Sequence, residues 1–78
     1  MKDSSVMALL NGLTASADAI QKMKPDHPQY EGMVNSFRRQ VDQLRVMENL
    51  FSPECKRISA AAREEFEAVL LTEVHVTA

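Results

Sequence analysis

The chain contains one cysteine, Cys55, no tryptophan, three phenylalanines and one tyrosine. A single cysteine excludes a disulfide within the chain and fits a reducing cytoplasm. Because aromatic side chains are so few, the core must be built mainly from Leu, Val, Ile, Met and Ala. At 78 residues, we expect one domain, 1–78, with a small core of its own.

Neither positive nor negative charge dominates, since nine basic and eleven acidic residues give a net charge of −2. This balance creates no field that attracts nucleic acid or an anionic membrane. No apolar run approaches the roughly 18–20 residues that cross a bilayer, and the first residues, MKDSSVMALLNGL, are too polar for a signal peptide. We therefore expect a cytoplasmic protein with no nucleic-acid or membrane partner.

Residues that carry catalysis or bind metal are also sparse. His27 and His75 have no further ligand at a helical spacing, whereas a stable metal site needs three or four placed ligands. Cys55 would lie near a helix N-terminus and Lys56, which lower a thiol pKa, but it falls on an apolar stripe without a nearby histidine as base. We predict no enzymatic activity, metal, cofactor or small-molecule substrate, and a structural, buried Cys55.

The clearest pattern that is present lies in the stretch Gln29–Phe51. Apolar residues recur there at steps of three and four, which predicts one amphipathic α-helix over about 29–51. The apolar stripe consists of Tyr30, Met33, Val34, Phe37, Val41, Leu44, Met47 and Phe51.

A first helix is predicted over about 4–23, because Asp3, Ser4 and Ser5 offer capping oxygens before a second apolar stripe. The prolines of residues 24–28 then force a turn. If the chain reverses there, positions whose numbers sum to about 54 face each other, so Ala17 lies opposite Phe37, small against large. This match favours a helical hairpin.

A third helix is predicted over about 53–72, with Ser52 as N-cap and Pro53 in the first helical position. Its stripe holds Cys55, Ile58, Ala62, Phe66 and Val69, and residues 73–78 are expected to form a frayed tail. The predicted fold class is therefore all-α, a helical hairpin extended to three helices.

The placement of the third helix is left open by the sequence. Folding back would bring Lys56 and Arg57 near Glu48, and later glutamates near arginines of the second helix. The connection is effectively one residue, however, where about two to eight are usual. Either the second helix frays before Phe51, or the third helix leaves at a wide angle and packs on another chain.

A partner-binding surface is predicted at the end of the second helix. Val46 and Leu50 fall on the side opposite the stripe, next to the adaptable Met47 and to Phe51. Three short helices have too little interior to cover both faces. We therefore predict a protein–protein interaction module that binds a partner helix, forms a homodimer, or both, through Val46, Met47, Leu50 and Phe51.

A family resemblance sharpens this expectation. A helix, a short polar turn and a second helix opened by Pro28-Gln29-Tyr30 resemble the small co-chaperones of type III secretion needle subunits, over a little more than half the chain. In that family a Pro-x-Gln-Tyr element opens the second helix, and the hairpin pairs with a larger repeat-containing chaperone to hold the needle protein monomeric in the cytoplasm. This chain lacks one spacer residue and adds a helix from Pro53.

The turn Pro25-Asp26-His27-Pro28 also resembles the Pro-x-x-Pro turn of the needle subunits themselves, although the break at Ser52-Pro53 argues against that version. The resemblance implies a chaperone or adaptor and no catalytic residue.

An alternative function is a small transcriptional regulator or anti-activator that contacts DNA or a DNA-binding protein. Six basic residues could line one edge of a helix pair, but interleaved acidic residues favour a solvated, salt-bridged face. These basic residues are Arg38, Arg39, Arg45, Lys56, Arg57 and Arg63.

Overall fold

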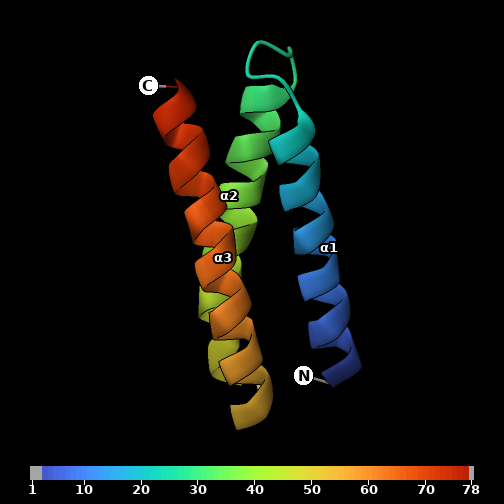
Figure 1. Cartoon of the computed structure of the whole chain (residues 1–78). Helices are drawn as coiled ribbons and strands as arrows, with labels where there is room; N and C mark the ends of the chain where they lie inside the picture. The colour runs from blue at the N-terminus through green and yellow to red at the C-terminus, as the bar shows by residue number, and fades with distance from the viewer. Residues whose placement is uncertain (1–2, 78) are drawn as a thin grey trace.

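The computed structural model describes the backbone of residues 3–77 and the side chains of residues 3–72. Its elements are α1 (Asp3–Lys22), α2 (Tyr30–Met47), a short 3₁₀ helix η1 (Glu48–Leu50) and α3 (Pro53–Thr77). The three α-helices lie side by side, each antiparallel to the one before it (Figure 1). The described part contains no strand, so the predicted all-α three-helix fold is confirmed.

The turn between α1 and α2 is stabilised by its own hydrogen bonds. The His27 N–H donates to the Lys24 carbonyl at 2.9 Å, and the Tyr30 N–H donates to the His27 carbonyl at 3.0 Å. The His27 Nδ1 accepts the Gln29 N–H at 3.1 Å. His27 is exposed and serves the local turn, as expected of a polar side chain between two prolines.

The α1–α2 hairpin buries the two stripes that the sequence predicted to face each other. Ala17 and Phe37 are both buried. The same is true of the other pairs that face each other if their numbers sum to about 54, namely Leu13 with Val41, Leu10 with Leu44 and Ile20 with Val34. Phe37 also meets α3, because its ring lies edge-to-face against Phe66 with centroids 5.7 Å apart. Phe37 therefore links the core of the hairpin to α3.

The junction after α2 follows one of the two alternatives that the sequence left open, in which the second helix ends before Phe51. The α-helix ends at Met47 rather than near residue 51, and η1 tightens the chain before Phe51 takes up an extended conformation at φ −87° and ψ 155°. Ser52 Oγ then accepts the Cys55 N–H at 3.3 Å, and the Ser52 carbonyl accepts the Lys56 N–H at 2.8 Å. The short connection works because α2 stops early, so α3 folds back on the hairpin of its own chain.

The far end of α3 also differs from the prediction. The helix continues to Thr77, beyond the expected end at residue 72, and includes residues that we expected to form a frayed tail. No glycine or proline interrupts residues 72–77, so nothing in the local sequence stops the helix. Within the described part of the chain, no helix is long and apolar enough to cross a bilayer.

Candidate partner-binding surface

Val46 and Leu50 lie on the outside of the bundle, as predicted for part of the partner-binding surface. Val46 is 70% exposed and Leu50 is 72% exposed. Val46 occupies the last turn of α2 and Leu50 ends η1, so the two branched side chains are four residues apart on consecutive turns. A pair of large aliphatic side chains with this exposure is available to a partner.

Phe51 and Met47 do not share that exposure. Phe51 is only 8% exposed and belongs to the core, so its inclusion in an exposed partner-binding surface is wrong for the folded chain. Phe51 was already a member of the apolar stripe of the second helix, and its side chain stays in the core although its backbone is extended. Met47 is half-buried and packs against the core.

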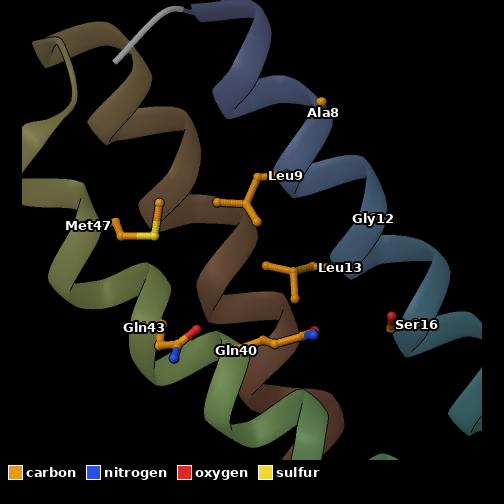
Figure 2. Close-up of a pocket in the computed structure, with 8 residues that line it drawn as sticks. All are labelled: Ala8, Leu9, Gly12, Leu13, Ser16, Gln40, Gln43 and Met47. Carbon is orange, nitrogen blue, oxygen red and sulfur yellow. The ribbon is translucent and has the colours of Figure 1, made fainter.

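Met47 instead lines an open groove between α1 and α2 with a volume of about 470 Å³. Figure 2 shows Leu9 and Leu13 of α1 pointing toward α2, where Gln40, Gln43 and Met47 form the other wall. The remaining lining residues are Ala8, Gly12 and Ser16. No lining residue carries a charge, although charged residues make up 26% of the chain, so the groove suits an uncharged surface.

The sequence analysis did not predict this groove, although a signal for it was present. Residues 4–17, SSVMALLNGLTASA, contain no charged residue. A solvated helix face normally carries charges at its exposed positions. The uncharged run in residues 4–17 therefore indicates that the exposed face of α1 differs from the charged surfaces of α2 and α3.

A smaller groove of about 270 Å³ lies between α2 and α3 and is lined by Val41, Leu70 and Leu71 together with charged residues. Arg38, Asp42 and Glu67 supply those charges. This groove is therefore apolar with a mixed-charge rim, in contrast to the uncharged α1–α2 groove.

A polar cluster is buried where η1 meets α3. Glu48 is 4% exposed and Ser59 is fully buried. Ser59 Oγ donates to Glu48 Oε2 at 2.9 Å. Arg63 binds both carboxylate oxygens, with Nε 2.8 Å from Oε2 and Nη2 3.1 Å from Oε1, and this bidentate geometry is the strongest form of such a pair.

The pKa of the Glu48 carboxyl is shifted by opposing effects. Burial raises it, but hydrogen bonds from Arg63 and Ser59 and the positive charges of Arg63 and Lys56 lower it, so the net pKa lies below the ordinary value of 4.5. The hydrogen bonds to Glu48 and Glu67 raise the pKa of Arg63. Both groups are therefore charged at neutral pH.

The cluster continues to the surface through Glu67. Arg63 Nη1 donates to Glu67 Oε1 at 2.9 Å, and Arg45 Nη2 donates to Glu67 Oε2 at 2.9 Å. The expected pairing of a glutamate of the third helix with an arginine of the second helix is therefore present, and Arg45 is the arginine that makes it. Arg45 and Arg63 are held by carboxylates, which weakens the alternative reading of a phosphate-binding edge.

Folding back was expected to bring Lys56 and Arg57 near Glu48, but the residues that bind its carboxylate are Ser59 and Arg63. The position of Glu48 also indicated burial. Glu48 follows Leu44 by four residues and so continues the apolar stripe of α2 onto the core side. The hydrogen-bonding residues Ser59 and Arg63 are also four residues apart, on one side of α3. The sequence signal for burial of Glu48 was therefore a charged residue on a core stripe, together with two residues of the third helix that can hydrogen-bond to it.

Cys55 and His27, two of the residues considered for catalysis or metal binding, lie in separate elements of the fold. Cys55 is buried, in agreement with the predicted structural role, and His27 lies in the turn at the other end of α2. His75 lies outside the described side chains. Among the described residues, no group of three or more metal-ligating side chains could hold an ion.

No protein-family model, curated protein or solved structure matches this chain. The resemblance to secretion co-chaperones therefore rests on the sequence pattern around Pro28-Gln29-Tyr30 alone. The candidate surface is defined by the chain's own geometry.

Proposed function

We propose that the chain is a non-enzymatic interaction module that binds an apolar face of a partner helix. The observation that carries this proposal is the exposure of Val46 and Leu50, at 70% and 72%, on consecutive turns. A few large apolar anchors of this kind supply most of the affinity when a helix docks on a surface. The adjoining Met47 adds an adaptable side chain.

The specific role that we propose is that of a cytoplasmic chaperone or adaptor, in particular one that serves type III secretion. The Pro28-Gln29-Tyr30 segment supports it, because α2 begins at Tyr30, the place where the resembling motif opens its second helix. The Tyr30 side chain is buried and so fixes the start of α2 against the bundle. In this role the partner is a secreted subunit or a second chaperone with an exposed amphipathic helix.

The variant Leu50→Asp tests the surface. It places a charge among the anchors, so we expect association to weaken by about 2 kcal/mol or more, with most of the helicity kept because Leu50 contributes little to the core. Sedimentation of the isolated chain detects a homodimer, and co-expression with candidate secretion subunits followed by co-purification detects a foreign partner.

Arg39→Glu is the control, because it introduces a negative charge at an exposed position of α2 rather than at the Val46 and Leu50 pair. It should change mainly the rate of association and its salt dependence. A wild type that stays monomeric and binds no such subunit, or a Leu50→Asp variant that unfolds outright, contradicts the proposal. Binding to random DNA that falls steeply with salt would favour the transcriptional regulator instead.

A further inference from the structure

The groove between α1 and α2 has a rim of small residues on one side and larger side chains on the other. Ala8, Gly12 and Ser16 follow one another along α1, each four residues from the next (Figure 2). Gln43 and Met47 of α2 form part of the opposite wall. Because the distance between packed helices depends on the size of the side chains at the contact, the α1 rim allows a further helix to approach closely.

The lack of charge in the groove limits what can occupy it. No lining residue is charged, so a helix that brought charged side chains into the groove would lose their hydration without gaining an ion pair. The exposed faces of α2 and α3 carry such charges, among them Arg39 of α2 and Glu64 of α3. The occupant must therefore present an uncharged helix face.

A face of this kind is present on α1 of the same chain. Residues 4–17 carry no charge, and the inner stripe of α1 is already buried in the bundle. Steps of three and four residues keep one seam of a helix against a second helix over several turns. Small exposed residues recur along α1 at these steps, namely Ser5, Ala8, Gly12, Ala15 and Ala19.

Gly12 lies at the middle of this seam. A Cβ added there meets nothing within 4 Å in the single chain, so packing within the chain does not require glycine, although glycine weakens a helix relative to alanine. In a two-fold dimer, the residue beside the axis meets its own copy. A glycine at that position allows the closest approach of the two helices.

We propose that the α1–α2 groove is the interface of a symmetric dimer, in which α1 of a second copy lies antiparallel to the first α1 and rests against Gln43 and Met47. The two-fold axis passes beside Gly12. The contact is reciprocal, because each α1 fills the groove of the other copy and lines its own. The dimer needs neither Val46 nor Leu50 and so does not rest on the proposed function.

The size of this contact suits a stable dimer. The 20 residues of α1 span about 30 Å at about 1.5 Å per residue. A contact two helices wide, about 20 Å, covers roughly 600 Å² in projection, and its accessible surface is larger because side chains project from it. A specific dimer buries about 800 Å² per partner, so one α1 and the adjoining wall of α2 suffice.

Sedimentation equilibrium of the full-length chain over a range of concentrations tests the dimer, with Ala8→Glu as the variant. We expect wild type to dimerise reversibly and Ala8→Glu to weaken dimerisation by at least about 10-fold, because an unpaired charge enters the uncharged groove. Ala61→Glu is the matched control, the same substitution at an exposed position of α3, and should change the dissociation constant by less than about twofold. A wild type that is monomeric at every concentration, or equal dimerisation of the two variants, overturns the dimer.

Gln43→Glu tests the opposite wall with a side chain of nearly the same size, so it remains informative if Ala8→Glu perturbs α1. We expect it to weaken dimerisation several-fold while circular dichroism shows unchanged helicity. Dimerisation as tight as that of wild type would mean that α2 is not part of the interface and that the proposed arrangement is wrong.

Gly12→Cys tests the position of the two-fold axis. Two such residues beside the axis lie within the roughly 4.4–6.8 Å between Cα atoms that a disulfide spans, so mild oxidation should give a covalent dimer. The native Cys55 is buried and does not compete. Ala61→Cys is the control and should stay monomeric on a denaturing gel. A dimer that is not cross-linked through residue 12 contradicts the axis.

Leu50→Asp separates this interface from the proposed partner-binding surface. Loss of the dimer in Ala8→Glu but not in Leu50→Asp supports the groove, whatever the result for a secretion subunit. If Leu50→Asp abolishes the dimer and Ala8→Glu does not, the second copy binds at Val46 and Leu50 and the groove dimer is wrong. A monomeric wild type whose binding to a co-expressed subunit is lost in Ala8→Glu would place a foreign helix in the groove and also overturn the dimer.

Discussion

Glu48 shows how one residue can combine a core position with a charged side chain. The carboxylate is 4% exposed, yet within the described part of the chain no buried side-chain polar atom lacks a hydrogen-bond partner. Removing one member of such a cluster leaves the others buried and unsatisfied. Ser59 and Arg63 therefore stabilise the fold by satisfying the buried carboxylate of Glu48. The loss of any one of the three residues leaves a buried polar group of the others without its partner.

Packing in the folded chain does not explain why residue 12 is a glycine. A Cβ added there meets nothing within 4 Å, and its φ lies outside the left-handed region. Glycine in a helix interior is less favourable than alanine by about 0.8–1.0 kcal/mol, so Gly12→Ala should stabilise the isolated chain by about that amount.

Thermal or urea unfolding of the Gly12→Ala variant measures this gain. Gly32→Ala is a useful comparison, because a Cβ at Gly32 also meets nothing within 4 Å but lies close to the N-terminus of α2, where the gain should be smaller. A loss of stability in Gly12→Ala would show that α1 is tighter around this position than the structure indicates.

Cys55 illustrates the structural use of a lone thiol. Because its side chain is buried and packed in the core cluster, Cys55→Ala should lower the free energy of unfolding by about 1 kcal/mol, within the usual range for a small core truncation. Partner binding should remain. If Cys55→Ala keeps full stability but loses binding, Cys55 has a functional role and not a structural one.

At the scale of the elements, the helices were predictable, and the early end of α2 was one of two alternatives that the sequence left open. The stripes of α1 and α2 are long and regular, and their facing pairs are all buried, so periodicity and the small-against-large match sufficed. The early end of α2 depends on burying Glu48 against Ser59 and Arg63, residues of another helix. The position of Glu48 on the core stripe and the Ser59–Arg63 pair hinted at this contact, but a helical pattern alone does not show that the two lie together. Phe51 was already part of the apolar stripe, so its burial agrees with the pattern, and its inclusion in an exposed surface was wrong.

The hairpin register predicts a contrast between two alanines. Ala17 is buried in the core in the layer with Phe37, so Ala17→Leu should overpack the hairpin and destabilise it by about 1–3 kcal/mol. Ala61 is exposed on α3, so Ala61→Leu should have little effect. Thermal melts in which both variants are equally harmless would contradict the register.

The whole molecule divides its surface by charge. The outer faces of α2 and α3 carry most of the ionic residues, whereas the α1–α2 groove is uncharged and α1 carries charges only at Asp3, Asp18 and Lys22. The exposed Val46 and Leu50 follow the groove residue Gln43 along the chain. The aliphatic pair was predictable from the sequence, because both residues lie off the helical stripe. The groove was not predicted, because its shape depends on how the two helices approach each other.

The stability of the molecule should depend on pH through Glu48. Its pKa in the folded chain lies below the ordinary value of 4.5, so the folded state favours the charged form. Such a group contributes stability that is fully present above the unfolded pKa and is lost as the pH falls through the folded pKa. Wild type is compared with Glu48→Gln by urea unfolding at a series of pH values, because pH effects that do not involve Glu48 are common to both chains.

We expect wild type to be the more stable of the two by a constant amount at neutral pH, and this advantage to shrink as the pH falls below about 4.5. A pH-independent difference would mean that folding leaves the pKa of Glu48 unchanged. An advantage of wild type that grew toward acid would mean that burial outweighs Arg63 and Ser59, since a raised folded pKa stabilises the protonated form. Only a shrinking advantage agrees with an ionised Glu48 held by both residues of α3.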